Sequence, residues 1–476
     1  MSTKPSVAIV PLGHYIYFQQ FEGLREELGR KAAQFAACFG DDTEVFVTDY
    51  VDRVEQSFAV VRELRRRDVD GIFLLLTTYL PSSLAAPFAN YLDAPQILVG
   101  IQPLDHLDYE KCTTYMQLVN DDICAMPEIA GVYLRLGRPM PPCIVAAAHQ
   151  EARVRTQVRV WQRAIAARAA FRYAQFGYLG HTYEGMYDMH TDPTAFSAAF
   201  KAHVRMLEMC ELKKYADAVP ADAIARKIDT VKATFSIQDP SVDPLTDYVR
   251  DGDLEWSARM ACALDEMVEQ NHLTALAYYY KGEADNEYER MGAALIIGNT
   301  LLTSRGIPLA GEADLKTAAA MLIMNRIGGG GSFAELHPFD VTGNCVLVGH
   351  DGPHNIAISE GKPVLRKLKK YHGKAGSGIG VEFSLKAGPV TMLSINCRPD
   401  GRFRLVAAAG VSEAGRIPQT GNTNTRVTFP GRDVTDFIAR WCEAGPTHHL
   451  ALGVGNLLPE IKAFARIMGL DLTIVE

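Results

Sequence analysis

The sequence has no apolar stretch that reaches the roughly 18 residues a membrane-spanning helix needs. It also lacks an excess of positive charge, since 48 Lys and Arg residues face 56 Asp and Glu, for a formal net charge of −8. An acidic protein of this kind is not expected to have nucleic-acid binding as its main task. We therefore expect a protein that works neither in a membrane nor on nucleic acid.

The sequence also lacks the cysteine pattern of a disulfide framework or of a closed zinc site. Its nine cysteines are scattered, and none forms a C-x-x-C pair. An odd number of dispersed cysteines is typical of reduced thiols. The chain opens without the apolar core of a signal peptide. Together these features predict a cytoplasmic protein.

What is present is an ordinary globular composition, with 476 residues of which 48% are hydrophobic. This length favours about three domains. Short, continuously apolar runs alternate with helical segments over the first hundred residues, which predicts a parallel sheet covered on both faces. The apolar runs are 7–10, 44–47, 71–76 and 96–99, and the helical segments are 18–38, 54–67 and 82–92. Ligands are expected at the loops that follow Val10, Leu76 and Val99.

A long helical stretch near 145–170 leads into a second α/β unit, and the pattern changes again after about residue 325. The second unit has predicted strands at 176–180 and 275–280, and predicted helices at 194–215, 221–234 and 255–271. The third has predicted strands at 345–348, 356–359, 380–385, 390–397, 403–409 and 426–429, a hairpin turn at 398–402, and helices near 433–442 and 458–468. We expect two N-terminal Rossmann-like α/β domains with parallel sheets, 1–168 and 169–325, followed by a C-terminal, mostly antiparallel β-barrel domain, 326–476.

Side chains that can bind metal gather in four segments, which are 311–316, 332–337, 349–354 and 445–449. A helix from 312 to 326 is about 21 Å long, and the residues from 326 to 335 can span about 30 Å. Glu335 can therefore return to the start of this helix, where Glu312 lies, and four consecutive glycines (328–331) supply the dihedral angles of a sharp return. Two carboxylates with one or two imidazoles suit Mn²⁺ or a similar ion better than a structural zinc.

Each segment also has a structural interpretation. Glu312 and Asp314 are acidic residues of the kind that favours a helix N-terminus, and Lys316 reads as a solvated helix residue. The glycine run, which no Gly-Lys-Ser/Thr sequence follows, can be a flexible connection rather than a P-loop. The segment with His350, Asp351 and His354 can be a turn.

A resemblance favours the interpretation as a metal site. The motifs Gly-Glu-x-Asp-x-Lys-Thr-Ala-Ala (311–319), Gly-Gly-Ser-Phe-Ala-Glu (330–335), Gly-Asn-x-x-Leu-x-Gly-His (343–350) and Ala-Gly-x-x-His-His (444–449) occur in this order. They resemble the L-arabinose isomerase family, within the L-arabinose and L-fucose isomerase superfamily. The similarity covers the final 165 residues well and the first 300 in outline.

The resemblance implies a metal-dependent aldose–ketose isomerase that transfers a proton through a metal-stabilised ene-diolate. Glu312 and Glu335 fall on the family's two glutamates, as metal ligands and as the linked acid and base. The last histidine ligand falls in the pair His448-His449, where we favour His449. The fourth ligand falls on His350 if the alignment has a one-residue gap, with Asp351 and His354 as the alternatives. The expected cofactor is Mn²⁺ or another divalent cation such as Co²⁺ or Mg²⁺.

The resemblance also implies a small-molecule sugar substrate and a homo-oligomer, a hexamer built from trimers, with active sites shared between subunits. Residues of the predicted pocket wall, each of which can instead be ordinary packing, are His14, Tyr17, Gln19, Tyr79, Gln102 and Met186. Two other functions fit the same motifs. One is an epimerase or lyase that acts on a modified sugar or sugar acid at the same metal site, and the other is a non-catalytic sugar-binding protein.

Overall fold

The computed structural model describes residues 4–283, 286–369 and 378–476, and the segments 1–3, 284–285 and 370–377 lie outside this description. The chain divides into two compact units, residues 1–169 and residues 170–476. The division into three domains stays a prediction.

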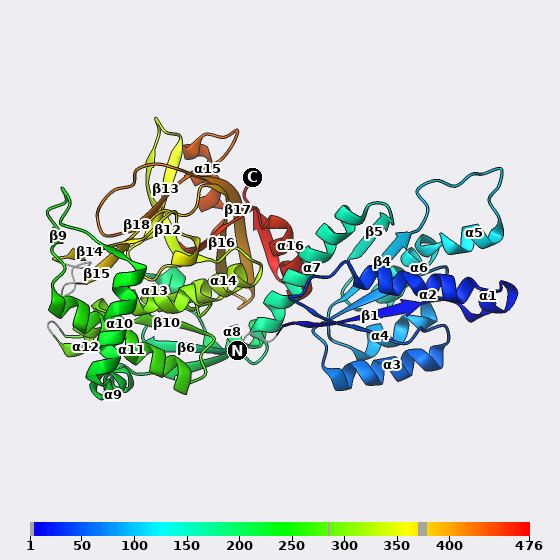
Figure 1. The fold of residues 1–476 in the computed structure, drawn as a ribbon, viewed down its shortest axis with the longest axis horizontal. Helices are drawn as coiled ribbons and strands as arrows, with labels where there is room; N and C mark the ends of the chain where they lie inside the picture. The colour runs from blue at the N-terminus through cyan, green and yellow to red at the C-terminus, as the bar shows by residue number, and fades with distance from the viewer. Residues whose placement is uncertain (1–3, 284–285, 370–377) are drawn as a thin grey trace. The chain divides into compact units, whose positions relative to one another are not determined.

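The first unit is built on a five-stranded sheet in which all the pairings between neighbouring strands are parallel. Its strands are β1 (Ser6–Leu12), β2 (Glu44–Val47), β3 (Gly71–Leu76), β4 (Gln96–Gln102) and β5 (Cys143–Ala147), and they lie in the order β2-β1-β3-β4-β5. Figure 1 labels β1, β4 and β5. β3 is buried along its whole length, as an unbroken apolar run predicts for a strand covered on both faces. The prediction of a parallel sheet in this part of the chain is confirmed.

Helices connect these strands, because parallel neighbours need a crossover connection. They are α1 (Tyr15–Gln20), α2 (Leu24–Ala36), α3 (Val54–Arg67), α4 (Ala86–Tyr91), α5 (Thr114–Val119), α6 (Asp122–Arg135) and α7 (Glu151–Phe171), with the 3₁₀ turn η1 (Ser82–Leu84). Leu24, Leu28 and Phe35 are buried on one face of α2, which packs on β1 and β2. Their spacing of four and seven residues explains why this segment folds as an amphipathic helix.

The second unit begins with a four-stranded parallel sheet in the order β11-β10-β6-β7. Its strands are β6 (Gln175–Gly180), β7 (His203–Leu207), β10 (Ala275–Tyr279) and β11 (Leu309–Ala310). Its helices are α8 (Pro193–Phe200), α9 (Met209–Ala218), α10 (Ala221–Thr234), α11 (Asp251–Gln270), α12 (Glu287–Ala293), α13 (Ile296–Ser304) and α14 (Leu315–Arg326), with the 3₁₀ turns η2 (Tyr187–Met189) and η3 (Gly311–Ala313).

One helix predicted in this region is wrong. The segment 194–215 is not continuous, because α8 ends at Lys201, which has a left-handed backbone (φ 62°), and the chain then forms β7. β7 lies at the edge of its sheet and its side chains are mostly solvent-accessible. No apolar run therefore marks it in the sequence, and its pairing with β6 decides its conformation.

The C-terminal part forms a seven-stranded sheet in the order β16-β19-β12-β13-β18-β17-β20, of which Figure 1 labels β12, β13, β16, β17 and β18. Its strands are β12 (Ser332–Asp340), β13 (Cys345–His350), β16 (Gly388–Cys397), β17 (Phe403–Glu413), β18 (Thr423–Thr428), β19 (Leu450–Val454) and β20 (Asp471–Ile474). All described pairings are antiparallel except that of β17 with β20. A mostly antiparallel sheet is confirmed. The barrel stays a prediction, because β16 also pairs with β17 but the ring is not evenly closed.

A smaller sheet and two further helices complete this unit. The small sheet contains β8 (Ser236–Ile237), β9 (Thr246–Asp247), β14 (Val364–Leu368) and β15 (Ile379–Glu382), and the helices are α15 (Val434–Glu443) and α16 (Leu458–Met468). The predicted hairpin turn at 398–402 is confirmed, since it joins the antiparallel strands β16 and β17. The strand predicted at 356–359 is wrong. This segment forms the 3₁₀ turn η4 (Ile356–Ile358), in which the Asn355 side chain accepts a hydrogen bond from the N–H of Ala357.

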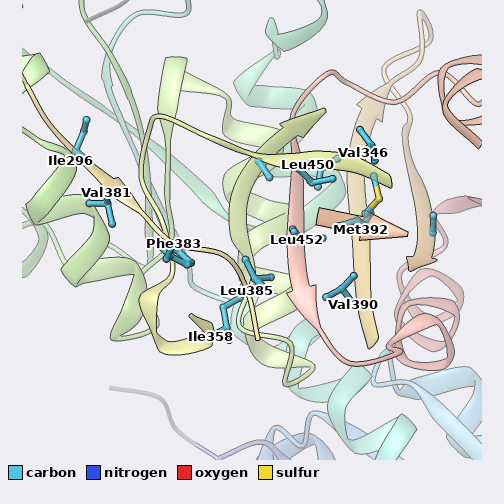
Figure 2. Packing of buried hydrophobic residues seen from close by; sticks show 14 of the residues in the cluster. Ile296, Val346, Ile358, Val381, Phe383, Leu385, Val390, Met392, Leu450 and Leu452 are labelled. Carbon is cyan, nitrogen blue, oxygen red and sulfur yellow. The ribbon is translucent and has the colours of Figure 1, made fainter. Parts of the chain in front are cut away.

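A large apolar cluster holds this unit together, and Figure 2 shows it between β19, β16 and β13 on one side and β15 on the other. Leu450 and Leu452 of β19 are fully buried in it, and Ala334 of β12 pairs with Leu450. Because alternate residues of a strand face opposite sides, the neighbours of Ala334 and Leu450 in the chain face away from this cluster. These neighbours are Glu335 and His449.

Among the described residues, the helices are either too short or too polar to cross a membrane.

Candidate functional site

Glu312 lies in the 3₁₀ turn η3, between β11 and α14. Its backbone and that of Ala313 are both left-handed, with φ of 54° and 57°. This conformation is strained for residues other than glycine, and such strain is concentrated at functional sites. The helix predicted to begin at 312 begins instead at Leu315, and Asp314 is its N-cap, accepting hydrogen bonds from the N–H groups of Lys316 and Thr317, both at 3.1 Å.

The glycine run reverses the chain between α14 and β12. Gly328, Gly330 and Gly331 have φ of 96°, 79° and 51°. A β-carbon on Gly331 would lie 3.0 Å from the Met321 carbonyl oxygen, so the turn also packs tightly against the helix it follows. The run is therefore a tight, specific turn rather than a flexible connection, and it returns the chain to Glu335.

Three neighbouring strands bring the remaining candidate ligands together. Glu335 on β12 pairs with Gly349 on β13, so it lies beside His350. Ala334 pairs with Leu450 on β19, and in this antiparallel register Glu335 lies beside His449. The approach of Glu335 and His449 therefore follows from strand register, whereas that of His350 depends on its place at the end of β13, because alternation alone would turn it to the side of Val346 and Val348.

The four side chains predicted as ligands face one another in the structure. His449 Nε2 lies 3.7 Å from Glu312 Oε2, and His350 Nε2 lies 3.9 Å from Glu335 Oε1. The two imidazole rings are 5.2 Å apart between their centres. Two sets of side chains bring one ligand atom each to within 4.8 Å of one another, namely Glu312 with His448 and His449, and Glu335 with His350 and His449. His449 belongs to both sets.

A carboxylate contacts the Nδ1 atom of His449, and another contacts the Nδ1 atom of His350. His449 Nδ1 lies 3.1 Å from Asp314 Oδ2, and His350 Nδ1 lies 2.8 Å from Asp351 Oδ1. A carboxylate accepts hydrogen bonds, so it favours a proton on Nδ1 and leaves the Nε2 lone pair available. The Gly352 N–H also lies 3.0 Å from His350 Nδ1, but the contact with Asp351 is shorter and charged. Asp351 therefore lies where it can orient His350.

Buried polar atoms without hydrogen-bond partners favour the binding of a cation at this site. Within the described part of the chain, Glu312 Oε2, His448 Nε2 and His449 Nε2 are buried and have no hydrogen-bond partner. Leaving such atoms unpaired is costly, and a cation would satisfy carboxylate oxygens and imidazole nitrogens together. The residues present therefore fit a divalent cation.

The pKa shifts show how negative the surroundings are. Burial acts to lower the pKa of His350, but the charge and hydrogen bond of Asp351 and the charges of Glu335 and Glu312 raise it to about 9. Burial acts to raise the pKa of Glu335, but a hydrogen bond from His337 and the positive charges of His350 and His449 lower it to about 2. An environment that stabilises a proton on His350 also attracts a metal ion, which competes with that proton.

A cavity of roughly 250 Å³ opens next to these groups. It is lined by Tyr183, Met186, Tyr278, Tyr279, Tyr280, Lys281, Gly292, Gly311, Glu312, His350, Asp351 and Gly352. Met186, predicted as pocket wall, therefore lies in the same cavity as Glu312 and His350. Glu335 is not among the lining residues.

The other predicted site residues fall elsewhere. His354 is fully buried, with its ring centre 5.6 Å from that of Phe383, and it belongs to neither set of candidate ligands. In the first unit, the ring centre of His14 lies 5.4 Å from that of Tyr17 and 6.2 Å from that of Tyr79. Gln19 is exposed, and Gln102 donates a hydrogen bond to the Leu104 carbonyl. The roles of all these residues stay predictions.

Sequence reasoning gave no site role to three residues around the site. Lys316 is not solvated but fully buried, and its amine donates hydrogen bonds to the Met189 carbonyl (2.8 Å) and to the Thr191 hydroxyl (3.0 Å). Asp188 contacts His448, and His337 lies 3.3 Å from Glu335. His337 follows Glu335 by two residues on one strand, so period-two spacing was the signal that could have revealed it.

The comparisons with known proteins agree with these motifs. Residues 330–471 match the family described as the L-arabinose isomerase C-terminal domain. The chain is 25% identical over 302 residues to the sulfoquinovose isomerase of Alkalicoccus urumqiensis, which covers 63% of this chain and 64% of that protein. It is 26% identical over 216 residues to the sulfoquinovose isomerase of Priestia megaterium, covering 45% of this chain and 47% of that protein.

A third relative is matched over more of its length. The chain is 22% identical over 416 residues to the L-arabinose isomerase of Acidothermus cellulolyticus, which covers 85% of this chain and 80% of that protein. By contrast, the chain spans less than two thirds of the length of the two sulfoquinovose isomerases. The match of residues 330–471 and these relatives, all named isomerases, support a divergent, arabinose isomerase-like protein.

Proposed function

We propose that this protein is a sugar isomerase that interconverts an aldose and a ketose with the help of a divalent cation held by Glu312, Glu335, His350 and His449. The observation that carries this proposal is the orientation of the two imidazoles. Their Nε2 atoms lie 3.7 and 3.9 Å from the two glutamates, while carboxylates hold their Nδ1 atoms. This arrangement is typical of histidines that bind metal.

The ligand chemistry favours Mn²⁺, with Co²⁺ or Mg²⁺ as alternatives. Two carboxylates and two imidazoles form a mixed oxygen and nitrogen site, which differs from the thiolate-rich sites of structural zinc. When bound, the cation would act as a Lewis acid that stabilises negative charge on oxygens of the substrate.

The two glutamates are the groups proposed to move the proton. A carboxylate takes the proton from carbon 2 of the aldose and a proton is returned to carbon 1, while the hydroxyl proton on oxygen 2 is lost and one is gained on oxygen 1, so the composition does not change. Glu312 lines the cavity, so we propose that it faces the substrate, with Glu335 as the second member of the acid/base pair. The low pKa of Glu335 keeps it ionised, which suits a ligand.

A sulfonated aldose is a second candidate substrate class. Two relatives are named sulfoquinovose isomerases. Lys281 is among the described residues that line the cavity, and an ammonium group can bind an anionic substituent. This assignment changes the substrate and leaves the proton transfer as it is.

Three further parts of the proposal concern the whole protein. We propose a homo-oligomer that shares its active sites between subunits, with residues of the first unit, among them His14, Tyr17 and Tyr79, in contact with substrate. We also propose that the antiparallel sheet acts as a barrel-like frame for the four ligands. The mass of the native protein, measured by light scattering, tests the first part, because a monomer would contradict it.

The activity is tested by a screen of aldoses, ketoses and sulfonated sugars with Mn²⁺ in deuterated water. We expect turnover, with deuterium entering the product at the carbon next to the carbonyl. Glu312→Gln should abolish turnover, while Glu443→Gln, an exposed change on α15, should keep it. If no sugar is converted by the Mn²⁺-loaded protein, the proposed function is wrong.

A further inference from the structure

His448 is an imidazole that the four-ligand site does not use. Its Nδ1 lies 2.7 Å from Asp188 Oδ2, and its backbone N–H donates to the same oxygen at 2.9 Å. Its Nε2 is buried, and no hydrogen-bond partner for it exists among the described residues. Its ring centre lies 3.9 Å from that of His449, and it offers a ligand atom within 4.8 Å of those of Glu312 and His449.

The partner of His448 comes from a distant segment of the same unit. Asp188 lies in the turn η2, 260 residues before His448 in the chain. The buried Lys316 amine fixes this turn by its hydrogen bonds to the Met189 carbonyl and the Thr191 hydroxyl. Lys316 follows Asp314, the carboxylate that contacts His449, by two residues on α14. One helix therefore positions the partners of both adjacent histidines.

This arrangement decides what Nε2 of His448 can do. Because Asp188 accepts two hydrogen bonds from one residue, it fixes both the position and the ring orientation of His448. Nε2 remains free of Asp188, and His448 offers a ligand atom within 4.8 Å of one of Glu312, which lines the cavity. Glu312, Glu335, His350 and His449 are the proposed ligands, so a bound cation would not need His448 as a further one.

We propose that Asp188 is a positioning residue that holds His448 for hydrogen bonding to a hydroxyl of the bound sugar, and that His448 is not a ligand of the cation. This inference rests on the proposed function, since it concerns the same site. Lys316 holds Asp188 and His448 in place indirectly, by fixing the turn that carries Asp188.

The test compares Asp188→Asn, His448→Gln and the double variant, with Asp192→Asn as the matched control. Asp192 lies four residues from Asp188 and caps α8, where asparagine caps as well. With the aldose found in the screen, we expect Asp188→Asn to raise KM about tenfold while kcat changes less than threefold. The double variant should be no worse than His448→Gln alone, because Asp188 acts through His448.

Mn²⁺ affinity, measured by the paramagnetic resonance signal of the free ion, gives a readout that does not depend on turnover. We expect Asp188→Asn and His448→Gln to bind Mn²⁺ within twofold of the unmodified protein, and His449→Gln to lose binding. A loss of Mn²⁺ affinity in His448→Gln would overturn the inference, as would additive effects on KM in the double variant or an unchanged KM in Asp188→Asn. If no sugar is converted, the function fails, yet the Mn²⁺ affinities still decide whether His448 is a ligand.

Discussion

Asp314 and Asp351 each contact the Nδ1 atom of a candidate ligand, at 3.1 and 2.8 Å. Replacing either with asparagine keeps the size of the side chain but removes the charge that favours a proton on Nδ1. Residues that orient a metal ligand contribute about 10- to 100-fold to affinity. We therefore expect Asp314→Asn and Asp351→Asn each to weaken Mn²⁺ binding by this factor, measured by titration calorimetry.

The control for these variants is Asp400→Asn, on the exposed turn between β16 and β17. It should bind Mn²⁺ as the unmodified protein does. The helix α14 should survive in Asp314→Asn, because asparagine is also a good N-cap. If both site variants bind Mn²⁺ normally, the two carboxylates do not orient ligands.

At the scale of single residues, the sequence motifs placed Glu312, Glu335 and His449 together, and the structure brings these side chains close to one another. The sequence left His350, Asp351 and His354 as alternatives. All three are polar and lie within five residues of one turn, and their spacing does not show which side chain faces the site. The roles of Asp351 and Lys316 depend on where their side chains point, which packing decides and spacing does not show.

The glycine run is the element on which the return of the chain to Glu335 depends. A methyl group on Gly331 meets Met324 Cβ at 2.9 Å and the Met321 carbonyl at 3.0 Å, and the residue has a left-handed backbone. Gly331→Ala is therefore expected to cost about 2–4 kcal/mol of unfolding free energy, as strain and overpacking add. Thermal unfolding of the second unit, followed by calorimetry, measures this cost.

Gly431→Ala separates the two contributions. Gly431 also has a left-handed backbone (φ 81°), but a β-carbon there meets no atom within 4 Å. This variant should cost about 1–2 kcal/mol, from backbone strain alone. Equal costs at positions 331 and 431 would mean that the tight packing of the glycine run does not contribute.

Lys31 joins three elements at one end of the first unit's sheet. Its amine donates hydrogen bonds to the carbonyls of Thr77 and Val119, both at 2.8 Å, and contacts Asp122 Oδ1 at 2.5 Å. Burial raises the pKa of Asp122 more than the charge and hydrogen bond of Lys31 lower it, so this pKa is about 6. Lys31→Met removes the positive charge, which would raise the pKa of Asp122 further.

The destabilisation by Lys31→Met should therefore grow with pH. The folded variant keeps a proton on Asp122 that the unfolded chain releases near pH 4, so its stability falls as pH rises above about 4. The fall continues beyond about pH 6, where Asp122 of the unmodified protein has lost its proton. At pH 7.5 the cost should be about 3–5 kcal/mol, the usual effect of leaving a buried charge unpaired, and at pH 5 it should be smaller.

Hydrogen exchange in β1 and β3, measured at both pH values, follows the stability of this unit. The double variant Lys31→Met with Asp122→Asn serves as the control, because it has no carboxyl group left to ionise. It should show little of this pH dependence. A single variant that is equally destabilised at pH 5 and pH 7.5 would contradict the account.

At the scale of elements, the sequence predicted strands and helices well where burial is complete, as for β3 and β10. It failed where a strand lies at an exposed edge, as for β7, and at 356–359, where apolar residues in a turn resembled a strand. In both cases the conformation depends on partners far away in the sequence or on a capping side chain, which local periodicity does not show.

At the scale of the whole molecule, the order of parallel and antiparallel sheets followed from the change in pattern near residue 325. The approach of His449 to Glu335 depends on the register of β12 with β19, across more than a hundred residues. The motifs indicated this approach through the resemblance alone. How far the sheet closes into a barrel depends on strand curvature, which the sequence pattern does not encode.

The central claim is that a cation binds where the two sets of candidate ligands share His449. The most direct test is the Mn²⁺ affinity of His449→Gln, compared with that of His203→Gln, an exposed change on β7. We predict one Mn²⁺ per chain for the unmodified protein and for His203→Gln, and a loss in His449→Gln that exceeds the about 10- to 100-fold loss of the orienting variants. Equal Mn²⁺ binding by His449→Gln and His203→Gln would contradict the claim.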